Sequence, residues 1–96
     1  MTPQEKELFR KSLLRVLDAN RTRFGLGVVP IASRLELFGF TLGNLGGAEA
    51  AHDLILTELD YLVSKQLVEE TPKLMSKENR VWRITTAGIA FLDSGA

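Results

Sequence analysis

Residues 54–92 decide the fold of this chain, and they read LILTELDYLVSKQLVEETPKLMSKENRVWRITTAGIAFL. The stretch begins with apolar residues at helical spacing, and residues 67–71 and 81–85 then carry the alternation and β-favouring side chains of two strands. Polar residues 72–79, which include a proline, separate these strands as a hairpin tip would. Residues 87–92 supply apolar side chains for a short final helix. The stretch therefore predicts a helix, a β-hairpin and a second helix.

The helix that enters this stretch spans residues 48–66. At about 100° per residue, one face collects a broad apolar arc, formed by Ala48, Ala51, Ile55, Leu59 and Leu62, with Leu54, Leu56 and Val63 at its edges. The opposite face should contact water, and it holds Ala50, Asp53, Thr57, Asp60 and Ser64, with Glu49 at its border. After the hairpin, Thr85 or Thr86 can cap the final helix.

The beginning of the chain predicts another helix. Thr2-Pro3-Gln4-Glu5 is a capping box with proline at the first helical position. Apolar residues follow at helical spacing, at Phe9, Leu13, Val16 and Leu17. We expect this helix to end near Asn20, a residue that tolerates the left-handed conformation of a helix end. Three cations lie off the apolar stripe and should be solvated, namely Arg10, Lys11 and Arg15.

Between these helices the pattern is less regular. Residues 28–30, Val-Val-Pro, can form at most a brief edge strand, because proline stops it. Residues 31–38 predict a short second helix with Ile31, Leu35 and Phe38 on one side. Glycines break residues 39–47, which we expect to form a loop.

Together these elements predict an α+β fold, a winged helix-turn-helix with a three-helix core, a two-stranded β-hairpin wing and a short C-terminal helix. A length of 96 residues favours a single domain over 1–96. Apolar residues make up 45% and charged residues 25% of the chain, as in soluble globular proteins. The chain has no cysteine, which excludes a disulfide framework. It shows neither a signal peptide nor a membrane-spanning stretch, so we expect a cytoplasmic protein with no membrane partner.

Two motifs resemble a known family. Residues 59–70, LDYLVSKQLVEE, resemble the exit from the recognition helix in winged-helix regulators of the MarR and PadR type, and residues 80–88, RVWRITTAG, resemble their arginine-bearing wing and Thr-x-x-Gly helix start. The resemblance implies a winged-helix DNA-binding domain. This chain departs from the family at Gln66, where glycine is usual, and in the glycine-rich residues 39–47. More faintly, the layout resembles small winged-helix proteins of Mu-like phages.

Signals of catalysis and metal binding are weak. His52 is the single histidine, and its place near the apolar arc favours a packed side chain over a catalytic one. Together with Glu49 and Asp53 it lacks a fourth metal ligand. Gly25 and Gly27 lack the strand and lysine context of a phosphate-binding loop. We therefore expect no enzyme activity, no catalytic residue, no metal site and no cofactor.

The charge distribution favours a polyanion at the two ends of the chain. The net charge is zero, but residues 1–34 hold seven basic against three acidic residues, residues 35–70 hold one against seven, and residues 71–96 hold four against two. The leading hypothesis is a small bacterial or phage transcriptional regulator that binds double-stranded DNA. Cations of the wing would hold phosphates, namely Lys73, Lys77, Arg80 and Arg83. Polar residues nearest the groove would be Ser33, Arg34, Thr57 and Ser64.

Two features oppose that hypothesis. First, lysines on a hairpin have another explanation, because they keep an edge strand from pairing with another chain. The expected recognition helix exposes Glu49, Asp53 and Asp60, which repel phosphate. The alternative is a winged helix that binds a protein and does not bind DNA.

Six apolar residues bear on this alternative, because the predicted apolar faces of the helices do not require them. These surplus apolar residues are Leu8, Leu14, Leu37, Phe40, Leu42 and Leu45. Either the loop at 39–47 folds back over the core, or these residues form an interface with a second copy or another protein. The first helix is then the expected interface. A homodimer would also match a palindromic DNA site.

Overall fold

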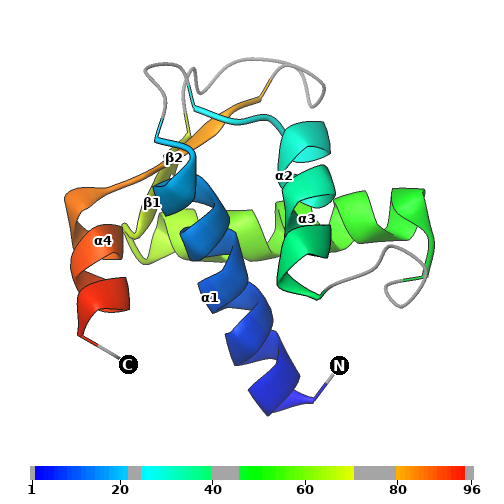
Figure 1. Cartoon of the computed structure of the whole chain (residues 1–96), viewed down its shortest axis with the longest axis horizontal. Coiled ribbons are helices and arrows are strands. Elements are labelled where there is room, and N and C mark those ends of the chain that lie inside the picture. Colours follow the sequence, from blue (N-terminus) through cyan, green and yellow to red (C-terminus); the bar gives the residue numbers. More distant parts are fainter. Residues whose placement is uncertain (1, 22–24, 40–45, 71–79, 95–96) are drawn as a thin grey trace.

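A computed structural model describes residues 2–21, 25–39, 46–70 and 80–94, without the side chains of Phe38 and Ala48. The described residues form an α+β fold, as predicted, whose elements are α1 (Pro3–Ala19), α2 (Val28–Leu35), the 3-10 helix η1 (Glu36–Phe38), α3 (Ala48–Ser64), β1 (Val68–Glu70), β2 (Trp82–Ile84) and α4 (Thr86–Asp93). Helix α1 lies between α2 and α4, and α3 runs behind α1 and α2 (Figure 1). The two strands form an antiparallel hairpin beside α1.

The core lies where the helices and the hairpin meet. Its fully buried large side chains come from three helices and both strands, and they are Phe9, Leu13, Leu14, Val16, Leu17, Ile31, Leu35, Ile55, Leu59, Leu62, Val68 and Trp82. The predicted apolar stripe of α1 is therefore confirmed. Leu14, counted as surplus from the sequence, belongs to the same core.

Helix α1 begins where the capping signal predicts. The Thr2 side chain accepts a hydrogen bond from the Glu5 backbone N–H at 3.1 Å, and Pro3 is the first helical residue. The helix ends at Asn20 as predicted, but φ there is −121°, so the end is not left-handed. Instead, the backbone N–H and the side-chain Nδ2 of Asn20 both donate to the Val16 carbonyl, at 3.1 and 2.8 Å. The asparagine side chain thus adds a second hydrogen bond to the Val16 carbonyl in the last turn of the helix.

The expected edge strand at residues 28–30 is wrong, because α2 begins there. Pro30 lies in the first turn of α2, where a helix needs no backbone N–H. The β-contact comes earlier in the chain: Leu26 and Trp82 exchange two backbone hydrogen bonds of 2.9 Å each. The predicted second helix therefore starts before residue 31, and η1 continues it after α2 ends.

Helix α3 has the two faces that its periodicity predicts. Five residues of the apolar arc and its edges are buried, namely Ala51, Ile55, Leu56, Leu59 and Leu62. The five residues predicted to face water are exposed, and they are Ala50, Asp53, Thr57, Asp60 and Ser64. The outward face of α3, which we define as these five residues with Glu49, is therefore accessible to a partner.

The turn from α3 into β1 depends on Gln66, whose φ is 63°. The Gln66 backbone N–H donates to the Val63 carbonyl at 2.9 Å, and the Leu67 N–H donates to the Leu62 carbonyl at 3.1 Å. This pair of hydrogen bonds is the Schellman ending, in which glycine usually holds the left-handed position. Gln66 therefore performs the task of the missing glycine, with the steric strain of a side chain in that conformation.

Replacing Gln66 by glycine should raise the free energy of unfolding by about 0.5–1 kcal/mol. The relief of left-handed strain outweighs the extra freedom that glycine gives the unfolded chain. Urea denaturation followed by circular dichroism measures the change. Gln66→Ala keeps the strain and serves as the control, so a glycine variant no more stable than the alanine variant would contradict this account.

The hairpin register pairs Val68 with Ile84, Glu69 with Arg83 and Glu70 with Trp82. The predicted strands are confirmed in shorter form, and the predicted tip at 72–79 lies outside the described residues. Of the two candidate caps for the final helix, Thr85 is the one used: its Oγ1 accepts a hydrogen bond from the Gly88 N–H at 3.0 Å.

Gly88 fits α4 tightly against the turn after α3. A Cβ atom added at Gly88 would lie 2.2 Å from the Leu67 carbonyl oxygen and 2.7 Å from a side-chain carbon of Ile84. The Thr85 hydroxyl also donates to the Gln66 carbonyl at 2.7 Å. The Thr-x-x-Gly motif therefore caps α4 and allows its close approach to this turn.

Candidate binding surfaces

Metal ligands do not gather within residues 2–21, 25–39, 46–70 and 80–94: no three of their His, Asp and Glu side chains are placed to hold an ion. The described helices also include none that is long and apolar enough to cross a membrane. His52 is half-buried on α3. The features that bear on binding are the charged side chains around α3 and the hairpin, and two hollows beside α1.

Arg80, one of the four cations assigned to the wing, is held by two carboxylates. Its Nη2 donates to Asp60 of α3 at 2.7 Å and to Glu70 of β1 at 2.5 Å. The guanidinium also lies 5.0 Å from the centre of the Trp82 ring. Its side chain is only 21% exposed. Arg80 therefore joins the base of the hairpin to α3, whereas the sequence predicts that it contacts DNA phosphates.

The cluster around Arg80 has one more negative than positive group. The hydrogen bond to Glu70 raises the pKa of Arg80, burial opposes that rise, and the hydrogen bond to Asp60 adds to it. The guanidinium thus stays charged, but two carboxylates share it. A phosphate would have to displace one of these carboxylates and then lie beside it.

Of the other three wing cations, Arg83 forms a surface ion pair, and two lysines lie outside the described residues. Arg83 of β2 pairs with Glu69 of β1 at 2.7 Å, and both side chains are exposed, 42% and 47%. Water and salt screen such a pair, so it holds Arg83 weakly. Lys73 and Lys77 lie outside the described residues.

Arg34, assigned to the DNA groove, connects α2 to the end of α1. Its Nε donates to the Asn20 side-chain oxygen at 3.0 Å, and its Nη1 donates to the Pro30 carbonyl at 3.3 Å. The neighbouring Ser33 is exposed on α2. Arg34 is therefore a structural link between two helices, whereas Ser33 remains accessible.

Thr57 and Ser64, the groove residues expected on α3, are exposed as predicted. Their hydroxyls already have partners in their own helix: Thr57 donates to the Asp53 carbonyl at 2.9 Å, and Ser64 donates to the Tyr61 carbonyl at 2.6 Å. The charged side chains beside them on this face are acidic. The outward face of α3 therefore combines negative charge with hydroxyls that donate internally.

Arg10, Glu58 and Tyr61 form a cluster that the sequence did not predict. Glu58 is 3% exposed and forms an ion pair with Arg10 of α1, which is 24% exposed. The Arg10 guanidinium also lies 3.7 Å from the centre of the Tyr61 ring. The expectation that Arg10 is solvated is therefore wrong. One feature of the sequence could have predicted this cluster. Glu58 directly precedes Leu59 of the buried apolar arc, so its carboxylate needs a cation as a partner.

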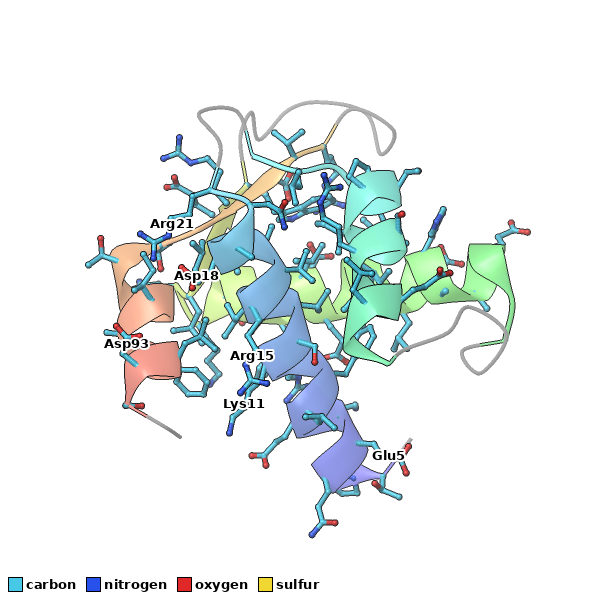
Figure 2. The ribbon with its side chains drawn as sticks, in the orientation of Figure 1. Glu5, Lys11, Arg15, Asp18, Arg21 and Asp93 are labelled. Carbon is cyan, nitrogen blue, oxygen red and sulfur yellow. The ribbon has the colours of Figure 1, made fainter. Side chains whose placement is uncertain are left out.

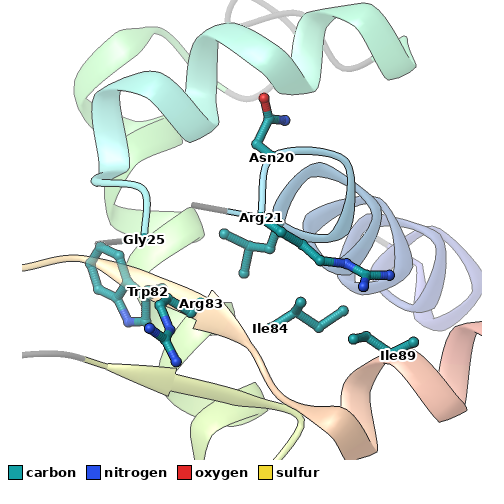
Figure 3. Close-up of a pocket in the computed structure, with 8 residues that line it drawn as sticks. Asn20, Arg21, Gly25, Trp82, Arg83, Ile84 and Ile89 are labelled. Carbon is teal, nitrogen blue, oxygen red and sulfur yellow. The ribbon is translucent and has the colours of Figure 1, made fainter. Parts of the chain in front are cut away.

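A small hollow of about 260 Å³ lies where α1, β2 and α4 meet. Arg21 extends over its apolar residues Ile84 and Ile89, whereas Arg83 points toward β1 (Figure 3). Arg21 pairs with Asp18 at 2.5 Å and Arg83 pairs with Glu69. Both arginines at this hollow are thus matched by a carboxylate.

The second hollow is a groove of about 490 Å³ between α1, the end of α3 and α4. Its lining comes from all three helices and the turn after α3, and it consists of Glu7, Arg10, Lys11, Leu14, Tyr61, Leu62, Lys65, Leu67 and Phe91. We call this the α1–α4 groove. Unlike the face of α3, it carries more cations than acids.

The surplus apolar residues separate into three groups. Leu14 is core, whereas Leu8 and Leu37 are 51% and 84% exposed. Phe40, Leu42 and Leu45 lie outside the described residues. Both the interface and the folding of the loop over the core stay predictions.

No known protein family, curated protein or solved structure matches this chain. The resemblance to winged-helix regulators therefore stays a prediction.

Proposed function

We propose that the chain is a non-catalytic winged-helix module that binds another protein rather than duplex DNA. The order of the elements supports the winged-helix assignment, because α1, α2 and α3 precede a hairpin that follows α3 directly. The Leu26–Trp82 pairing adds a short third segment to that hairpin. Helix α3 then occupies the position of a recognition helix.

The charge around α3 carries this proposal. Its outward face presents Glu49, Asp53 and Asp60, and the described arginines of the hairpin are each paired with carboxylates. Binding of DNA draws its affinity chiefly from cations that neutralise phosphates. Binding of a protein has no such requirement, and exposed Leu8 and Leu37 offer apolar contacts.

A titration of labelled duplex DNA tests the proposal. At low salt, about 50 mM, even non-specific DNA-binding proteins bind with dissociation constants well below 100 µM. We expect no rise in fluorescence anisotropy up to about 100 µM protein with random-sequence or phage-derived duplexes. Salt-dependent binding in that range would refute the protein-binding proposal.

DNA binding remains the second candidate, and the observation that favours it is a hairpin directly after α3 whose connecting segment contains Lys73 and Lys77. Such a protein would be a small bacterial or phage transcriptional regulator. Lys73→Ala/Lys77→Ala is the variant that tests this candidate, because Arg80→Ala would also break contacts to α3. Under this candidate the double variant loses DNA affinity, while Lys6→Ala/Lys11→Ala, with the same change of charge on α1, retains it.

A further inference from the structure

The α1–α4 groove has an apolar floor that its own domain does not fully cover. Leu14 and Leu62 form the buried part, and Leu67 and Phe91 remain half-buried. Helix α4 contributes to this incomplete coverage, because Gly88 is its single fully buried residue among those described. Phe91 of α4 thus keeps accessible surface in the groove.

The rim of the groove is cationic. Three cations, Arg10, Lys11 and Lys65, face one acid, Glu7. Arg10 already has Glu58 as a partner. Within the described residues, neither Lys11 nor Lys65 forms an ion pair, and Lys65 lies 5.6 Å from the Tyr61 ring centre. These two lysines, one on α1 and one directly after α3, line the groove and are therefore available to a negatively charged partner.

A neighbouring cation adds to this field. Arg15 is exposed and follows Lys11 by about one turn of α1. Both side chains point from α1 toward the side on which α4 lies (Figure 2). The positive potential thus extends along the flank of α1, on a part of the surface separate from the acidic face of α3.

We infer that the α1–α4 groove binds an amphipathic helix of a partner protein, with apolar side chains on one face and Asp or Glu bordering that face. The apolar floor matches the helix-in-groove mode of recognition. The lysines at the rim, Lys11 and Lys65, favour an acidic partner over a basic one. This inference names the partner class for the protein-binding function proposed above, and it rests on that function.

A designed peptide provides the probe. It has about 18 residues, enough for partial helicity, with leucine at i, i+3, i+4 and i+7 and glutamate at the flanking positions. A matched peptide carries lysine in place of every glutamate. Titration of each peptide into the isotopically labelled full chain, followed by NMR, locates the binding site and gives its affinity. We expect the acidic peptide to shift the amide signals of Leu14, Tyr61, Leu67 and Phe91.

Charge reversal at the rim should weaken this binding. Lys11→Glu/Lys65→Glu replaces two attractions with two repulsions, and we expect about a tenfold rise in the dissociation constant of the acidic peptide. Lys6→Glu makes the same kind of change on α1, but residue 6 does not line the groove, so its effect should be less than about twofold. Circular dichroism of all variants checks that the fold is intact.

Four results would overturn the inference. In the first, the acidic peptide leaves the groove signals unshifted up to about 1 mM, and in the second, the basic peptide binds with equal affinity. In the third, the shifts are confined to the outward face of α3, and in the fourth, the groove signals change with protein concentration alone. The last result would show that a second copy fills the groove. If the peptide fails and duplex DNA also fails to bind, the groove inference falls while the protein-binding function stands.

Discussion

Replacing Arg10 by alanine is expected to lower the free energy of unfolding by about 3 kcal/mol. The Arg10 guanidinium is paired with Glu58, whose side chain is 3% exposed. Truncation would leave that carboxylate buried without its cation, which is the costly way to break an ion pair. The same change removes the guanidinium that lies over the Tyr61 ring. Because Arg10 itself is 24% exposed, water limits the loss to this value.

Two further variants separate the ion pair from general effects of shortening α1 side chains. Arg15→Ala removes an exposed arginine from the same helix and should change stability by less than about 0.5 kcal/mol. Arg10→Met/Glu58→Leu replaces both charges with apolar groups and should regain most of the loss. Urea denaturation near neutral pH measures all three. Equal midpoints for Arg10→Ala and Arg15→Ala would show that the pair does not stabilise the fold.

Replacing Trp82 by alanine should lower the free energy of unfolding by about 3–5 kcal/mol. Trp82 is fully buried, and it is the largest fully buried side chain among the described residues. Its ring packs beneath the Arg80 guanidinium, and its backbone pairs with Leu26. The cavity left by alanine would therefore loosen the hairpin from the core. For a domain of this size, such a loss is comparable with the whole stability.

Trp82→Phe is the matched control. The Trp82 Nε1 is buried and has no hydrogen-bond partner within the described part of the chain, so phenylalanine removes no hydrogen bond and keeps most of the ring. We expect less than half the loss caused by alanine. Since Trp82 is the one tryptophan in the chain, unfolding is followed by circular dichroism rather than by tryptophan fluorescence. An alanine variant with the parent's unfolding midpoint would show that Trp82 does not stabilise the core.

The sequence predicts most of the local structure because local structure depends on neighbours along the chain. Thr2 and Thr85 cap their helices through residues three positions later, and the faces of α3 follow from helical periodicity alone. The failure at residues 28–30 has the opposite cause. β-branched residues before a proline favour a strand locally, but the pairing of Leu26 with Trp82 places the strand contact earlier and leaves Pro30 to the first turn of a helix.

For the candidate binding surfaces, too, the sequence predicts the features that depend on one helix, and the tertiary structure decides the rest. The sequence by itself determined that Thr57, Ser64 and the acids of α3 face outward, since this requires only the period of one helix. Tertiary structure alone decided which cations are available. Arg10 meets Glu58 across 48 residues and Arg80 meets Asp60 across 20, while Lys11 and Lys65 face a common groove. Ion pairing depends on distance through space, and only the packing of α1, α3 and the hairpin sets that distance.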